Sequence, residues 1–193
     1  MINMTHITLL DYNVSMVNAW KRYFSSTDDN ISIVWSSFAH FMETHSDVDG
    51  IVSPANSFGY MDGGYDKAII DYLGPQAQTN VLTMINARYD GYQPVGTCLP
   101  IGFDKYTILH TPTMRVPEKI SDVRVIFDCM FSCLTEARKL KLKHIVIPAF
   151  GGCTGGVPYD IIAIQMHRAY ERTFRPLNSS KINWNAAHNF LIH

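Results

Sequence analysis

The sequence is short of charged residues and has no apolar run long enough to form a membrane helix. Only 17% of its 193 residues are charged and 47% are hydrophobic, a balance that favours a packed core over a disordered chain. No apolar run approaches the roughly 18 residues of a membrane span, and the first residues lack the basic and apolar regions of a signal peptide. We therefore expect a globular protein that does not associate with membranes.

The sequence also lacks an excess of charge of one sign and a pattern of closely paired cysteines. The formal net charge is −1, so we expect no unspecific binding to nucleic acid, which depends on excess positive charge. None of the four cysteines forms a CxxC pair, which favours free thiols in a reducing, cytoplasmic compartment. The nearest histidine pairs are five residues apart, unlike the i,i+4 pair of a zinc helix. We expect neither a metal nor a cofactor.

Segments typical of strands and of helices alternate along the chain. Apolar or β-branched runs predict strands over Ile7–Leu10, Ile31–Trp35, Ile51–Ser53, Gly96–Ile101, Tyr106–Thr111, His144–Ala149 and Phe190–Ile192. Helical spacing predicts helices over Val14–Phe24, Ala39–His45, Tyr65–Leu73, Pro75–Arg88, Ser121–Leu142 and Pro158–Phe174. Unbroken apolar strands separated by helices belong to a sheet covered on both faces. We expect one α/β domain over residues 1–193, a three-layer α/β/α sandwich with a mixed, largely parallel sheet, in which residues 1–30 form a strand–helix extension.

Individual residues mark where several of these helices begin and end. Asn13 and Ser121 precede helical patterns and are predicted N-caps, because their short side chains accept hydrogen bonds from the first-turn N–H groups. Gly74 follows a helical pattern and is a predicted C-terminal stop.

Two loops after predicted strands have an unusual composition. Residues 53–66 contain asparagine, two aspartates and paired glycines, and residues 151–156 include four glycines just before a predicted helix. Ligands of open α/β sheets bind beyond the carboxyl ends of the strands. Glycine-rich backbone at a helix start can close its N–H groups around an anion, so the two loops together favour a diphosphate site over mobile surface loops. Neither loop is a P-loop or a GxGxxG motif.

The residues of these loops resemble the macro domain family, which binds ADP-ribose. The resemblance covers about residues 31–175 and is most specific between Asn56 and Asp66. The segments that carry it are Ser53-Pro54-Ala55-Asn56, Gly63-Gly64-Tyr65-Asp66, Leu109-His110-Thr111, Ile147-Pro148-Ala149 and Val157-Pro158. A Ser-Pro-x-Asn-Ser stretch stands where most of the family has Asn-Ala-Ala-Asn, so the nearest branch is a divergent one.

The sequence departs from the family pattern at the adenine end. The family usually has Gly-Asp after the strand that corresponds to Ile31–Trp35, and this Asp binds the adenine amino group. Here Ser36 and Ser37 occupy that place. Asp11, at the end of another predicted strand, is a possible substitute, provided that the two strands are parallel neighbours and share their carboxyl edge.

The resemblance implies that Asn56 and Asp66 are the catalytic residues. Asn56 would bind the distal ribose and help to hold a water, whereas its structural alternative is an Asx turn after Pro54. Asp66 would accept a hydrogen bond from a ribose hydroxyl or activate a water. Its structural alternative is a favourable interaction with a helix dipole, worth about 0.3–1 kcal/mol.

Three further residues are weaker candidates. Asp62 either interacts with solvent or acts as a second carboxylate near the ligand. His110 ends an apolar strand and is more readily a hydrogen-bonded core residue than a catalyst. Cys153 could be a nucleophile in a loop of N–H groups, but packing as a small residue is the stronger interpretation.

The predicted function is binding of ADP-ribose or an ADP-ribosylated molecule, with hydrolysis of ADP-ribosyl conjugates or of ADP-ribose 1″-phosphate. The alternatives are a non-catalytic binder of ADP-ribose or a related nucleotide, and a structural domain with no ligand. The predicted ligand-binding residues are Asp11, Ser37, Ala55, Ser57, Gly63, Gly64, Gly151, Gly152, Cys153, Thr154, Gly155, Gly156 and Val157.

Overall fold

A computed structural model describes residues 4–24, 29–175 and 183–185. Its six strands form one sheet in the order β2-β1-β6-β3-β5-β4. The strands are β1 (His6–Asp11), β2 (Ile31–Trp35), β3 (Gly50–Ser53), β4 (Leu99–Phe103), β5 (Tyr106–His110) and β6 (His144–Ile147). All neighbouring pairs are parallel except β4 and β5, which are antiparallel. The mixed, largely parallel sheet that the sequence predicts is therefore confirmed.

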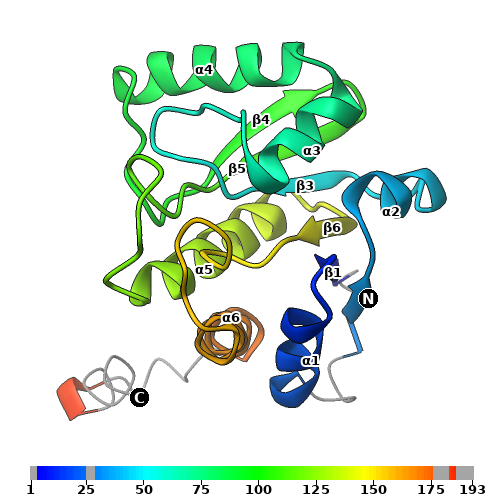
Figure 1. The fold of residues 1–193 in the computed structure, drawn as a ribbon, viewed down its shortest axis with the longest axis vertical. Helices are drawn as coiled ribbons and strands as arrows, with labels where there is room; N and C mark the ends of the chain where they lie inside the picture. The colour runs from blue at the N-terminus through cyan, green and yellow to red at the C-terminus, as the bar shows by residue number, and fades with distance from the viewer. Residues whose placement is uncertain (1–3, 25–28, 176–182, 186–193) are drawn as a thin grey trace.

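Helices cover both faces of this sheet (Figure 1). Within residues 4–24 and 29–175 the helices are α1 (Val14–Tyr23), α2 (Phe38–Thr44), α3 (Gly64–Leu73), α4 (Gln76–Tyr89), α5 (Arg124–Lys139) and α6 (Tyr159–Phe174). One buried apolar cluster joins α1, α5 and α6 to the sheet, and a second joins α2, α3 and α4 to the opposite face. Because successive strand residues face opposite sides, Ile145 and Val146 of β6 enter different clusters. This is the predicted three-layer α/β/α sandwich.

Local capping chemistry explains where several helices begin and end. Asn13 caps α1 and its Oδ1 accepts a hydrogen bond from the Ser15 N–H at 2.9 Å, as predicted. Gly74 ends α3 with a φ of 90°, in the left-handed region that favours glycine. The predicted N-cap Ser121 is wrong. The cap position of α5 is Val123, whose side chain makes no cap hydrogen bond, and the Oδ1 of the preceding Asp122 accepts from the Arg124 N–H at 3.0 Å.

Strand ends differ from the predicted ones for similar local reasons. β4 begins at Leu99 rather than Gly96, because the Gly96 N–H donates to the carbonyl of Pro112 in a connecting turn. β6 ends at Ile147, before Pro148, which has no N–H to donate to a neighbouring strand. The predicted strand Phe190–Ile192 lies outside the described residues.

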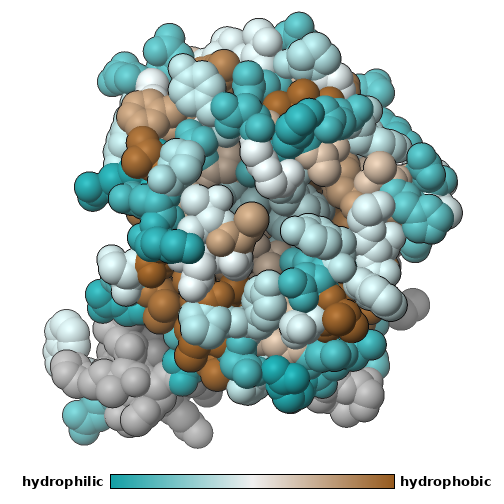
Figure 2. Space-filling model, in the orientation of Figure 1, coloured by the Kyte–Doolittle hydropathy of each residue, from teal (hydrophilic) through white to brown (hydrophobic). Residues whose placement is uncertain are grey.

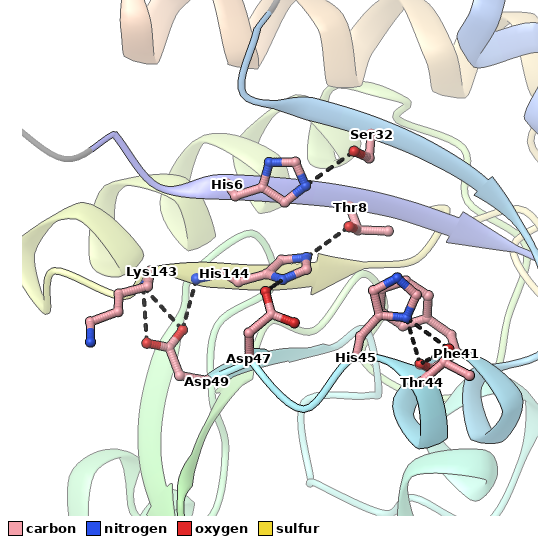
Figure 3. A network of polar contacts seen from close by, with 10 residues as sticks. All are labelled: His6, Thr8, Ser32, Phe41, Thr44, His45, Asp47, Asp49, Lys143 and His144. Atoms are coloured by element: carbon pink, nitrogen blue, oxygen red, sulfur yellow. Dashed lines mark hydrogen bonds and ion pairs between the residues drawn. The ribbon is translucent and has the colours of Figure 1, made fainter.

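Polar side chains hold together the edge of the sheet where the parallel strands begin (Figure 3). The ring of His144 contacts Asp47 Oδ2 through Nδ1 at 2.7 Å and Thr8 Oγ1 through Nε2 at 2.8 Å. The Asp49 carboxylate accepts hydrogen bonds from the N–H groups of Lys143 and His144. These contacts connect β1, β6 and the segment before β3.

The carboxyl ends of the five parallel strands meet at the opposite edge. Asp11 is in register with Trp35, and Ser53 with His110. The adjacency of β1 and β2 confirms the predicted arrangement in which Asp11 and the residues after Trp35 share one edge. Figure 1 shows the cyan loop after β3 and the yellow loop after β6 facing each other there. In the described part of the chain, no helix has the length and apolar character needed to cross a membrane.

Candidate functional site

Two adjoining cavities open at the carboxyl edge of the sheet. The first, of about 160 Å³, lies between the loop after β3 and the loop after β6. The second, of about 480 Å³, lies beyond the ends of β1 and β2. Five residues line both cavities and form their junction: Gly64, Tyr65, Ala149, Gly152 and Cys153. Figure 2 shows this face of the molecule hollowed between the part that carries α3 and the part that carries α6. The cavities therefore form one groove with two ends.

Asn56 lines the first cavity and also shapes the loop that carries it. Its Oδ1 accepts hydrogen bonds from the N–H groups of Phe58 and Tyr60, at 3.1 and 3.4 Å, and its Nδ2 donates to the Tyr60 carbonyl at 2.8 Å. The Asx turn considered from the sequence is therefore present. It places Asn56 in the cavity wall, and binding of a ribose by its amide stays a prediction.

Asp66 is a buried carboxyl group in the wall of the first cavity. It lies in the first turn of α3, and its residue is only 7% exposed. Burial raises the pKa of Asp66 to about 7, although the Ser53 hydroxyl opposes the shift by donating to its Oδ1 at 2.6 Å. A carboxyl with a pKa near neutrality can both accept and release a proton, as a general acid or base must.

The loop after β6 lines the groove with residues whose backbone N–H groups are not engaged by any described residue. Within the described part of the chain, no hydrogen bond engages the N–H groups of residues 152–155. Two bonds close the loop behind them, from the Gly156 N–H to the Cys153 carbonyl and from the Val157 N–H to the Gly151 carbonyl. Gly156 has a φ of 66°, and a Cβ there would lie 2.6 Å from Lys119 Nζ. The loop geometry therefore requires glycine and suits an anion.

Asp11 and Ser37 both line the second cavity. Asp11 Oδ1 accepts from the Asn13 N–H at 2.7 Å, and burial raises the pKa of Asp11 in spite of this bond. Its Oδ2 is engaged by no hydrogen bond from a described residue. The Ser37 hydroxyl accepts from the His40 N–H as the N-cap of α2. The free carboxylate oxygen can accept a hydrogen bond from a ligand, whereas Ser37 is already used in capping.

The structure brings most of the predicted site residues to the groove, but not all of them. The weak candidate Asp62 also lines the first cavity. Ser57, Gly156 and Val157 line neither cavity. Ser57 and Val157 are buried behind the loops. The predicted residues that line the groove are Asp11, Ser37, Ala55, Asn56, Gly63, Gly64, Asp66, Gly151, Gly152, Cys153, Thr154 and Gly155.

Sequence reasoning missed several residues of the groove wall. Tyr65 stands between two motif residues and packs edge-to-face on Phe38, with ring centroids 5.3 Å apart. Thr113 and Met114 follow β5, and the rule that ligands bind beyond strand ends could have found them. An isolated bridge between Asn56 and Met114 holds that segment beside the first cavity.

The weaker candidates have contrasting surroundings. His110 is fully buried, contacts Gln93 Oε1 through Nδ1 at 2.7 Å, and burial lowers its pKa to about 3, which confirms a core role. Cys129 and Cys133 are buried, but Cys153 is exposed in the groove rather than packed. Residues 4–24, 29–175 and 183–185 contain no cluster of three or more His, Cys, Asp or Glu side chains suited to a metal ion.

The raised pKa of Asp66 makes stability depend on pH. The folded state keeps a proton that the unfolded state releases between about pH 4 and about pH 7, so this stabilising contribution is lost as the pH rises through that range. Asp66→Asn, which cannot ionise, should raise the melting temperature relative to wild type more at about pH 8 than at about pH 5. Thermal denaturation at both pH values checks this, with Asp71→Asn, an exposed position on the same helix, as the baseline. An equal change in melting temperature at the two pH values would contradict the role of Asp66 in this pH dependence.

Comparisons with known proteins agree with this geometry. The sequence model of the Macro domain matches residues 52–166. An uncharacterized protein of Aquifex aeolicus is 30% identical over 142 residues, which cover 72% of this chain and 82% of that protein. The macrodomain of Mycobacterium tuberculosis DarG superposes with a TM-score of 0.57 at 17% identity, over 65% of this chain and 83% of that one.

Thermosipho africanus DarTG in complex with ADP-ribose superposes with a TM-score of 0.53 at 16% identity, over 77% of this chain and 43% of that one. At such low identities the superpositions show the fold alone, whereas the Macro domain match spans more than half of the sequence. The chain belongs to the macro domain family.

Proposed function

We propose that the groove binds ADP-ribose, with adenine in the second cavity, the diphosphate at the junction and the distal ribose in the first cavity. The observation that carries this proposal is the row of free N–H groups over residues 152–155, which begins with Gly152 and Cys153 where the two cavities meet and continues into the first cavity. An anion fits there, and each end has its own cavity for a further group. The relative from Thermosipho africanus, in complex with ADP-ribose, supports this choice of ligand.

The first cavity also supports hydrolysis at the distal ribose. In this reaction a water attacks the anomeric carbon, the ionised Asp66 carboxylate takes a proton from that water, and the bond to the attached group breaks. A pKa of about 7 allows Asp66 to be ionised at the start and to return the proton to the departing group. Asn56 would orient the ribose hydroxyls from the opposite side of the loop.

One observation favours the alternative of a non-catalytic binder. Both ends of the Asn56 amide are already engaged within residues 56–60. If those bonds persist with ligand bound, Asn56 holds the loop rather than a water. Turnover measurements separate the two functions.

We also place the protein in the cytoplasm, because all four cysteines are free thiols.

Binding should depend on the anion site at the junction. ADP-ribose should bind more tightly than AMP, and Thr154→Glu should weaken ADP-ribose by about tenfold or more, because the new carboxylate repels the diphosphate. Thr154 is exposed, so the fold should tolerate the change. Thr154→Gln, of similar size and without charge, is the matched control. Equal affinities for AMP and ADP-ribose in calorimetry would count against the anion site. So would an equal loss of ADP-ribose affinity in Thr154→Glu and Thr154→Gln.

Hydrolysis should depend on the Asp66 carboxylate. Asp66→Ala should lower turnover by about 10²-fold or more, as loss of a general base does. The fold should persist, as circular dichroism can check. The assay follows release of ADP-ribose from conjugates and of phosphate from ADP-ribose 1″-phosphate. No turnover of any of these by the wild type, with ADP-ribose binding intact, would leave the binder as the function.

The adenine end should depend on Asp11. Its free Oδ2 can accept from the adenine amino group, and a site built on such a bond rejects ligands that lack the donor. Asp11→Ala should weaken ADP-ribose several-fold and barely affect the hypoxanthine analogue. Asp11→Asn keeps an oxygen for the Asn13 N–H but presents a donor to the base, so it should favour hypoxanthine. Equal responses of the two ligands in calorimetry would exclude Asp11 as the adenine partner.

A further inference from the structure

The charged side chains that line the first cavity are all acidic. They are Asp62, on the exposed rim, and Asp66, buried in the wall. No lysine, arginine or histidine is among the residues that line this cavity in the described structure. The cavity that would receive the distal ribose therefore offers carboxylates, and no side-chain cation, to whatever is attached to that ribose.

The cations nearest in sequence are not among the lining residues of the cavity; Arg115, which follows the lining residue Met114, is exposed and does not line it. Lys67 forms an ion pair with Asp71 at 2.6 Å on the outer side of α3. The side chain of Lys119 lies over Gly156, behind the loop after β6, and does not line the cavity. Of the residues with free N–H groups, Gly152 and Cys153 lie at the junction, and Thr154 and Gly155 line the first cavity next to it. Asp62 is the exposed charged side chain among the lining residues of that cavity.

We propose that the first cavity selects ADP-ribose derivatives whose anomeric group is neutral or cationic and discriminates against ADP-ribose 1″-phosphate, with the Asp62 carboxylate as the discriminating side chain. This inference rests on the proposed function. It favours hydrolysis of ADP-ribosyl conjugates over hydrolysis of ADP-ribose 1″-phosphate, two reactions that the proposed function does not distinguish. A phosphate monoester carries a charge of about −1.5 to −2 at neutral pH. It would meet the exposed Asp62 carboxylate in a cavity whose lining residues include no side-chain cation to offset the repulsion.

The substrate class that fits is an ADP-ribosyl ester, amide or guanidine-linked conjugate. An ester or amide adds no charge beside Asp62, and a guanidinium group adds an attractive one. When water attacks the anomeric carbon, the leaving group of such a conjugate departs as a carboxylic acid, an amide or a guanidine that takes a proton, which the protonated Asp66 can supply.

The test measures affinity across three ligands that differ in the charge of the anomeric group. They are ADP-ribose 1″-phosphate, ADP-ribose and ADP-ribosyl-arginine, titrated by calorimetry into the inactive Asp66→Ala protein to prevent turnover. ADP-ribose 1″-phosphate should bind about threefold to tenfold more weakly than ADP-ribose at low ionic strength, and the arginine conjugate more tightly. Raising the salt from about 0.05 M to about 0.5 M should narrow both differences, because salt screens an exposed carboxylate.

Asp62→Asn, combined with the inactivating change, is the decisive variant. It should bring the three affinities closer together, since it removes the charge and keeps the size of the side chain. Asp104→Asn is the matched control, because Asp104 lies in the β4–β5 turn at the other edge of the sheet and should leave the ratios unchanged. Two results would overturn the inference while the proposed function stands. One is that Asp62→Asn leaves the ratios of the three affinities unchanged, and the other is that ADP-ribose 1″-phosphate binds as tightly as ADP-ribose. Absence of binding by all three ligands, in this protein and in the wild type, would reject both.

Discussion

The common direction of five strands is the constraint on which the rest of the structure depends. Their carboxyl ends meet at one edge, where Asp11 lies in register with Trp35 and Ser53 with His110. Loops far apart in the sequence therefore enclose one groove. The antiparallel strand β4 illustrates the converse, because its following turn leaves at the opposite edge and contributes nothing to either cavity.

The burial of Asp66 links the stability of the fold to its chemistry. A carboxyl group in the wall of a cavity loses water, and the single hydroxyl of Ser53 compensates only in part, so its pKa rises to about 7. The ionised form is thereby costly to the fold at neutral and higher pH. The same cost makes the group a proton acceptor and donor near neutrality, which an exposed aspartate would not be.

The groove differs in charge from its centre to its ends. The free N–H groups of Gly152 and Cys153 favour an anion at the junction, whereas Asp11 lines one end of the groove and Asp62 with Asp66 the other. A ligand that matches this distribution has a negative centre and groups at both ends that donate hydrogen bonds or carry no negative charge.

The sequence by itself determined the alternation of strands and helices, the positions of the two loops and the spacing from Asn56 to Asp66, because these follow from local periodicity, capping and turn chemistry. The tertiary structure decided which neighbours face the groove. Met114 enters the wall through its bridge to Asn56, whereas Val157 is buried behind the loop. It also decided the pKa of Asp66, because burial depends on segments distant in the sequence, whose approach no local pattern encodes.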